Sequence, residues 1–434
     1  MPVPLLDLQP QMAPLREEIM AAVGEVIDST GYILGPRVAS LEDAVASYCA
    51  TSPCEPPAQD ANGLQAIGVS SGTDALLVAL MALEVGPGDL VLTTPYSFFA
   101  TMGCILRLGA QPVFVDIDPV TYNLAPTAME EFFHTRPAEA ARVKACIPVH
   151  LYGQAADMSA VLRLCAAHGI PVVEDAAQAI GTAVPLDGGA ATAAGLVAPG
   201  AQKVADDRDA VALWRRAGSM GVAGCFSFFP SKNLGGIGDG GLVLCRDEAL
   251  AEKIRILRVH GGAPKYHHGL VGGNFRLDPI QAVVLEIKLR YLPAWHAARR
   301  VNADRYRQLF QEAGLVEDGS VVLPAAVYRP AAEVDGVNDF HIYNQFVIRA
   351  RRRDELMAHL QQAGIGCEIY YPVPLHRQGC VAHLECHAEV FPETERAARE
   401  TLALPIYPEL TAAMQQEVAA AINSFYRQGA VQGR

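Results

Sequence analysis

Residues 226–241 read Phe-Ser-Phe-Phe-Pro-Ser-Lys-Asn-Leu-Gly-Gly-Ile-Gly-Asp-Gly-Gly, and this stretch decides how the rest of the chain is interpreted. Lys232 lies in a turn rich in Ser, Pro and Gly between two apolar runs. Lysine normally occupies solvated surfaces, whereas a desolvated lysine has a lowered pKa and can form a Schiff base. The glycines follow the lysine instead of joining a first strand to a helix, so they are not a dinucleotide-binding fingerprint.

Two earlier segments have polar residues at the ends of predicted strands. Ser70-Ser71-Gly72-Thr73-Asp74 lies between a strand and a helix, where free amides and the helix dipole favour a phosphate. An ordinary capped helix start is the alternative explanation. Val172-Val173-Glu174-Asp175 ends a strand, and a carboxylate there points into the crevice where α/β proteins bind ligands. A helix N-cap aspartate is the alternative for this second segment.

The order of predicted elements indicates an α/β protein. Short β-rich runs alternate with helical segments after residue 65, which predicts a large domain over 1–290 with a mostly parallel sheet between helices. A smaller α+β domain is expected over 291–434, entered by one long helix over 285–314 and including a strand over 365–371. We expect a Pro-rich loop over 52–65, and an insertion over 184–220 that is part loop and part short helix.

Composition excludes several classes of protein. The 434 residues are 51% hydrophobic and 19% charged, which excludes a disordered chain. The net charge of −13 and the absence of a basic run argue against nucleic-acid and anionic-membrane binding. Ten cysteines without a CxxC motif, no signal peptide and no apolar run of about 18 residues predict a cytoplasmic protein. The Cys and His residues at 380–387 do not have zinc-ligand spacing, so no metal site is expected.

A phosphate-binding turn, an acid and a lysine are together what pyridoxal 5′-phosphate (PLP) requires. With these parts in this order, the sequence resembles the DegT/DnrJ/EryC1/StrS family of sugar aminotransferases, which have the fold type I scaffold of aspartate aminotransferase. The resemblance extends from about Leu5 through the tail and is carried by four motifs: SSGTDAL (70–76), EDAAQAIG (174–181), CFSFFPSKNLGGIGDGG (225–241) and GGNFRLDPIQAVVLEIKL (272–289). Taken alone, the last motif could be an ordinary Asp-Pro helix start.

The resemblance implies a role for each cofactor-binding residue. Lys232 would hold the cofactor and move protons, and Asp175 would pair with its pyridine nitrogen. Gln178 would lie near the ring hydroxyl. An aromatic side chain would stack on the ring and three residues of the turns would hold the phosphate; these are Phe98, and Gly72, Thr73 and Ser227.

The resemblance also implies residues for assembly and substrate binding. Asn274 would reach the cofactor phosphate of a neighbouring subunit in a homodimer. Tyr371 and His376 lie in the segment that lines the sugar-nucleotide site in relatives. Arg276 is our candidate for the carboxylate of the amino donor, because arginine binds carboxylates bidentately.

The expected activity is amino transfer from L-glutamate to a nucleotide-linked keto sugar, in amino-sugar or polysaccharide biosynthesis. Lys265-Tyr266-His267-His268, with Arg276-Leu277-Asp278 and Lys288-Leu289, resembles members that aminate C3. Amination at C4 is the alternative. A sugar 3-dehydrase is disfavoured, because those relatives replace the lysine with histidine. A non-catalytic PLP-binding regulator remains a further alternative, although no helix-turn-helix pattern supports it.

Overall fold

The structure is a computed structural model that describes residues 2–51, 63–196 and 213–432, with side chains up to residue 427. Most of the expected Pro-rich loop, 52–62, and the middle of the expected insertion, 197–212, lie outside the described residues. Among the described helices, none is both long enough and apolar enough to span a lipid bilayer.

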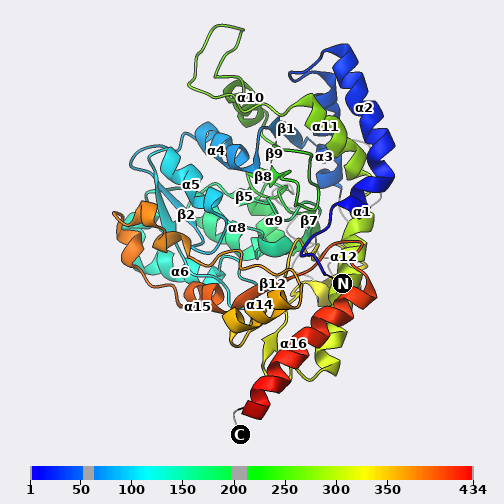
Figure 1. The fold of residues 1–434 in the computed structure, drawn as a ribbon. Coiled ribbons are helices and arrows are strands. Elements are labelled where there is room, and N and C mark those ends of the chain that lie inside the picture. Colours follow the sequence, from blue (N-terminus) through cyan, green and yellow to red (C-terminus); the bar gives the residue numbers. More distant parts are fainter. Residues whose placement is uncertain (1, 52–62, 197–212, 433–434) are drawn as a thin grey trace.

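The centre of the molecule is a sheet of short buried strands (Figure 1). The strand orders β1-β9-β8-β5 and β3-β2-β4 are joined by parallel bridges between Cys146 and Val172 and between Val149 and Asp175. β9 is antiparallel to both of its neighbours, and the other strands are parallel, which confirms the expected mostly parallel sheet. The strands are β1 (Gln65–Val69), β2 (Leu90–Thr93), β3 (Gln111–Phe114), β4 (Val143–Ile147), β5 (Val173–Asp175), β8 (Ala223–Ser227) and β9 (Gly241–Cys245).

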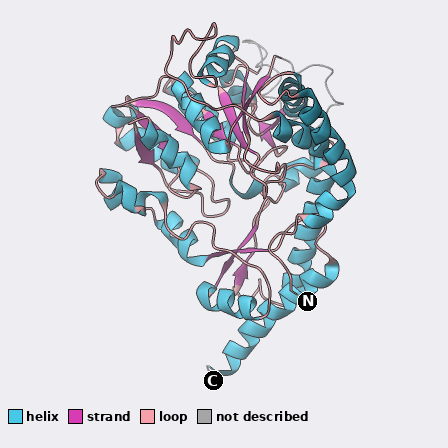
Figure 2. Cartoon of the chain, turned by 45° about the horizontal axis from the view of Figure 1, so that its top comes forward, coloured by secondary structure: helices cyan, strands magenta, loops and turns pink. Residues whose placement is uncertain are grey.

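Helices cover both faces of this sheet, because successive strand residues point to opposite sides. Val243 packs in the core under α4, α5 and α10, whereas Leu242 and Leu244 pack against α3 and α11. Figure 2 shows the strands enclosed by helices. The helices of this part are α1 (Gln9–Met12), α2 (Arg16–Ser29), α3 (Pro36–Ala50), α4 (Gly72–Ala82), α5 (Phe99–Arg107), α6 (Pro126–Thr135), α7 (Pro137–Ala140), α8 (Met158–Ala167), α10 (Glu248–Leu257) and α11 (Pro279–Leu289), with short 3₁₀ turns at Ala13–Leu15 and Leu151–Gly153.

The C-terminal part has its own antiparallel sheet, β10-β11-β12, and its own apolar core. Val3 is fully buried in that core, so the first residues pack with the C-terminal part; a boundary at 290/291 stays a prediction. The elements are α12 (Leu292–Glu312), β10 (Val321–Val322), α13 (Arg329–Asp335), β11 (Phe346–Ala350), α14 (Arg353–Gln362), α15 (Pro392–Glu400), β12 (Thr401–Leu404) and α16 (Ala412–Gln432), with 3₁₀ turns at Leu375–Arg377, Gly379–Val381 and Glu385–Ala388.

Two expected elements differ from the structure. The single long helix over 285–314 is wrong: α11 ends at Leu289 and α12 starts at Leu292 with Pro293 in its first turn, since proline cannot continue a helix already begun. The strand expected over 365–371 is also wrong. Ile365 and Glu368 form only isolated bridges, to Val3 and Ala403, and β12 is the strand at this edge.

The insertion begins and ends in a two-stranded antiparallel ribbon that the sequence analysis did not anticipate. β6 (Ala183–Leu186) pairs with β7 (Leu213–Arg216), and the expected short helix is α9 (Gly188–Ala193). Trp214 on β7 is 1% exposed, packs with residues near α13, and donates its indole N–H to Asp335 at 2.7 Å. The ribbon is therefore attached to the body of the protein by a large buried side chain.

We predict that Trp214→Ala lowers the free energy of unfolding by about 3–5 kcal/mol, because it removes a large buried ring and leaves the buried side of Asp335 unpaired. Urea unfolding followed by far-UV circular dichroism measures this change. Val334→Ala, an 85% exposed position on α13, is the control and is expected to change stability by less than about 0.5 kcal/mol. Equal effects of the two substitutions would contradict the anchoring role of Trp214.

Candidate active site

The residues that the sequence singles out gather at one edge of the central sheet. Strands β1, β2, β5 and β8 run in the same direction, so their carboxyl ends meet there. The turn at Gly72 follows β1, Phe98 follows β2, Asp175 ends β5, and the loop of Lys232 follows β8. Segments separated by up to 160 positions in sequence, such as Gly72 and Lys232, thus contribute to one site.

The start of α4 makes a cradle in which only glycine fits. A Cβ at Gly72 would lie 2.5 Å from the Cβ of Ser227, and one at Gly241 would lie 2.3 Å from the backbone of Ser71. Ser71 caps the helix by accepting a hydrogen bond from the Asp74 amide at 3.1 Å. The amides of Gly72 and Thr73 have no acceptor among the described residues, which leaves donors at the positive end of α4 for an anion.

Lys232 and Asp175 are the charged pair of the site. Burial lowers the pKa of Lys232 to about 8, and the negative charge of Asp175 partly offsets this effect. Burial raises the pKa of Asp175, while a hydrogen bond from Thr101, an amide of the chain and the charge of Lys232 oppose that rise. The lysine is therefore easily deprotonated, which Schiff-base chemistry requires.

The start of α5 holds Asp175 in place. Thr101 donates from its hydroxyl to Asp175 Oδ2 at 2.8 Å, and Ser97 lies 2.9 Å from the same hydroxyl. Phe98, the residue directly before this helix, is 61% exposed, so its ring is free to cover a ligand bound beside Asp175. Thr101 was missed by sequence reasoning, although it lies one helical turn after Phe98.

Gln178 is held between a backbone amide and an aromatic side chain. Its Oε1 accepts a hydrogen bond from the Tyr152 amide at 2.7 Å, and its Nε2 donates to the Tyr371 hydroxyl at 2.8 Å. Tyr371 packs edge-on against Tyr96 and parallel to Tyr152. The structure therefore brings two of the predicted residues, Gln178 and Tyr371, into direct contact and connects the C-terminal part to the site.

A second carboxylate, Glu174, is fully buried directly before Asp175. It accepts hydrogen bonds of 2.6–2.7 Å from the amides of Gly218, Met220 and Gly221. His150 Nδ1 accepts from the Ala156 amide, so its proton is on Nε2, which donates to Glu174 Oε2 at 2.8 Å. Four donors compensate the burial of this charge. No local pattern identifies these partners, because they come from two segments that are distant from Glu174 in sequence.

Helix α11 supports the loop that carries Lys232. Gln281 Oε1 accepts from the Ile237 amide at 2.9 Å, and the buried Lys288 donates to the Gly235 carbonyl. Burial lowers the pKa of Lys288 to about 8. Both residues lie in the fourth motif, but their support of the loop is visible only in the fold.

Asn274 and Arg276 run alongside the cradle. The carbonyl of Phe275 accepts from the Ser70 amide at 3.0 Å, and Arg276 bridges to Val69. Asn274 is exposed, and neither it nor Arg276 has a side-chain hydrogen bond to the described residues. Both side chains are therefore available to a ligand or to a second chain, as their predicted roles require.

The structure does not bring His376 to the site. Its side chain is 0% exposed and packs between Phe114 and Phe391. Burial lowers its pKa to about 4, and neither ring nitrogen has a hydrogen-bond partner in the described chain. The segment around it still reaches the site through Tyr371.

The residues at this edge fit PLP. The glycine-lined cradle with free amides suits its phosphate, Lys232 suits its aldehyde carbon, and Asp175 suits a protonated ring nitrogen. Within the described part of the chain, no three His, Cys, Asp or Glu side chains come together as a metal site would need.

Comparison with known proteins agrees with this geometry. The DegT/DnrJ/EryC1/StrS aminotransferase family matches residues 14–423. A pleiotropic regulatory protein of Geobacillus stearothermophilus is 43% identical over 98% of this chain and 99% of its own length. A UDP-N-acetyl-3-dehydro-alpha-D-glucosamine 3-aminotransferase of Acidithiobacillus ferrooxidans is 38% identical over 94% of each chain. The structure of DesV from S. venezuelae has a TM-score of 0.79, 35% identity and 98% coverage of both chains.

The lysine, the acid and the phosphate cradle on this sheet define a PLP-dependent enzyme of fold type I. More specifically, the chain belongs to the DegT/DnrJ/EryC1/StrS aminotransferase family, as the sequence motifs indicated.

We predict that the Lys232 amine of the cofactor-free protein is half-deprotonated near pH 8, because its burial disfavours the charged form. The extent of reductive methylation of Lys232 against pH, measured by peptide mass spectrometry, gives this midpoint. Asp175→Asn removes the charge that raises the pKa and is expected to shift the midpoint lower. A midpoint close to the ordinary lysine value of 10.5 would contradict the prediction.

Proposed function

We propose that this protein transfers an amino group from L-glutamate to the C3 keto carbon of a nucleotide-linked sugar, with PLP as cofactor. The observation that supports this most is the partly desolvated Lys232, whose pKa is influenced by the charge of Asp175, on the same sheet edge as the cradle at Gly72. The cytoplasm is the proposed compartment, since the nine described cysteines are free thiols.

When bound, PLP supplies a ring that withdraws electrons from the carbon that gains or loses a proton. The buried carboxylate of Asp175 would favour a positive charge on the ring nitrogen of a bound cofactor. Lys232 has a pKa of about 8, so it can accept a proton as the amine and return it as the ammonium near neutral pH. The hydrogen bond from Gln178 to Tyr371 holds these two side chains in place where the C-terminal part meets the site.

Amination at C3 is favoured by the relative from Acidithiobacillus ferrooxidans, which is named as a 3-aminotransferase. Amination at C4 remains the second possibility for the position. Arg276, half-buried beside the cradle and without a carboxylate partner among the described residues, is the proposed ligand for the glutamate carboxylate.

The second candidate function is a regulator, because one relative bears a regulatory name. The two functions make different demands on the site. Regulation needs no lysine with a lowered pKa, whereas amino transfer does. The lowered pKa of Lys232 therefore favours an enzyme over a regulator.

We predict that Lys232→Ala abolishes amino transfer, with a loss of at least about 10³-fold, because no other described amine lies beside Asp175. Purified protein is incubated with L-glutamate and a panel of 3-keto and 4-keto nucleotide sugars, and products are identified by mass spectrometry and NMR. Asp175→Asn is expected to retain PLP but to lose most of the rate. Undiminished turnover in Lys232→Ala would contradict the assignment, and amination of the 4-keto sugars alone would contradict the C3 position.

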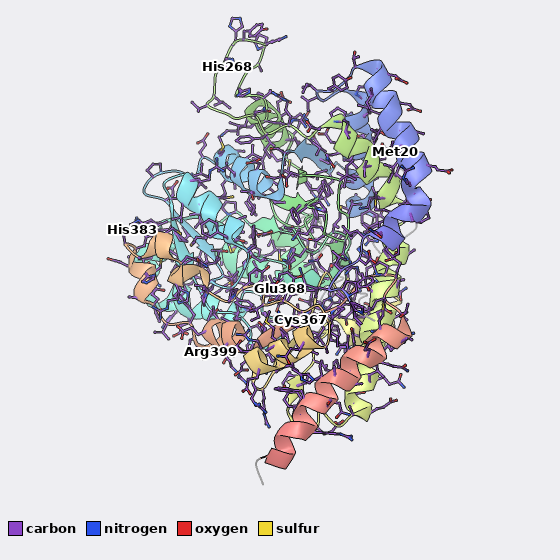
Figure 3. All side chains as sticks on the ribbon, in the orientation of Figure 1. Met20, His268, Cys367, Glu368, His383 and Arg399 are labelled. Carbon is purple, nitrogen blue, oxygen red and sulfur yellow. The ribbon has the colours of Figure 1, made fainter. Side chains whose placement is uncertain are left out.

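The active unit is proposed to be a homodimer with shared sites. Asn274 is exposed and forms a backbone bridge with Val259, directly after α10. The loop between these two residues extends away from the body (Figure 1). The face of α2 and the turn after it expose Met20, Ile27 and Ile33, each more than half exposed, and Figure 3 shows Met20 on the outside of this helix. Exposed apolar side chains grouped in this way suit a two-fold contact.

We predict that mixing two inactive variants, Lys232→Ala and Asn274→Asp, restores activity. In a mixed dimer with shared sites, one of the two sites has both native residues. Activity is measured after co-refolding, and native mass spectrometry verifies that mixed dimers form. Absence of rescue in verified mixed dimers, or a fully active single chain by light scattering, would contradict shared sites.

A further inference from the structure

A groove rich in arginine lies in the C-terminal part, outside the site described above. It has a volume of about 670 Å³ and lies between the β10–β11 edge, the start of α14 and the end of α15. Figure 3 shows Arg399 at the lower side of the molecule, opposite the loop that carries His268. Six guanidinium side chains line the groove: Arg349, Arg351, Arg352, Arg353, Arg396 and Arg399.

Three carboxylates line the same groove, and each is already paired. Arg353 contacts Asp354 at 2.6 Å, and Arg396 contacts Glu400 at 3.1 Å. Arg352 forms an ion pair with Glu355. Six positive and three negative lining side chains leave an excess of three positive charges at this place, in a chain whose net charge is −13.

The other three arginines have little or no compensation within the described chain. Arg349 has its Nε buried without a hydrogen-bond partner. Arg351 has no side-chain hydrogen bond or ion pair to the described residues. Arg399 approaches a carboxylate only at 4.0 Å, that of Glu395, which lies outside the groove lining. Like charges held together without counterions destabilise the fold, and a bound anion relieves that repulsion.

The backbone adds to the positive field. α14 begins at Arg353 with its positive end beside the groove. The preceding Arg352 provides no side-chain acceptor for the first amides of the helix. The expected absence of a basic run is therefore wrong here: four of the five residues 349–353 are arginines, and the fold adds Arg396 and Arg399 from α15.

We propose that this groove binds a small ligand through a diphosphate group, either inorganic diphosphate or the diphosphate of a nucleotide. Guanidinium groups bind phosphate oxygens bidentately, and the excess of three positive charges in the lining matches the two to three charges of a diphosphate. The volume is within the range of small-molecule sites, about 300–1,000 Å³. No aromatic side chain lines the groove, so recognition comes from the phosphates and not from a base.

The test is isothermal titration of the PLP-loaded protein with inorganic diphosphate. We expect saturable binding, weakened by salt, that falls by about tenfold or more in the double variant Arg351→Gln, Arg399→Gln. Both side chains are exposed, so the thermal midpoint and the basal amino-transfer rate are expected to stay unchanged. Arg163→Gln is the matched control, because this exposed arginine pairs with Asp187 far from the groove lining, and its affinity should equal that of the unmodified protein.

Titration with UDP and ADP distinguishes the two sources of the diphosphate. Affinities similar to that of inorganic diphosphate, all lost in the double variant, support phosphate recognition alone. If UDP or ADP binds much more tightly than inorganic diphosphate, and the double variant also loses that binding, a nucleotide is the source of the diphosphate group. Equal binding of diphosphate by the unmodified protein and the double variant would overturn the proposal, as would binding of an acidic peptide in place of diphosphate.

Discussion

The buried carboxylate of Glu174 connects three parts of the chain that the site requires. Its oxygens accept hydrogen bonds from three amides at the end of the insertion and from His150 after β4. Removing one donor from a buried charge costs several kcal/mol. The network therefore holds the segment after β4, strand β5 and the segment that precedes β8 in one arrangement. Because Asp175 is the next residue, the same network also fixes the position of its backbone.

The site combines a rigid acid with a lysine on a supported loop. Asp175 is fixed at a strand end by Thr101, whereas Lys232 follows β8 on a loop that α11 holds at Gly235 and Ile237. Desolvation and the charge of Asp175 act in opposite directions on Lys232. Desolvation is the larger of the two effects, so the pKa of the amine is lowered to about 8.

Local motifs were sufficient to predict the mostly parallel sheet and to place Asp175 at the end of a strand and Lys232 in the loop after another. The partners of Glu174 could not be found in this way, since His150 and Gly218 are distant in sequence. His376 has the sequence neighbourhood of a site residue, yet aromatic packing places it inside a core. Residues 365–371 have the composition of a strand, but Ile365 and Glu368 form only isolated bridges to other segments. Whether a segment becomes a strand depends on the partners that the fold places beside it, and the local sequence does not give these.

The contact of the first residues with the C-terminal core bears on how the chain folds during synthesis. Val3 exchanges backbone hydrogen bonds with Gly364 and Gly366, so its partners are about 360 positions later. At synthesis rates of about 5–20 residues per second, that interval is roughly 20 to 70 s. The central sheet can form within this time, while the start of the chain waits. The contact therefore cannot form before residues 364–366 have been synthesised, and it raises the contact order of the whole protein.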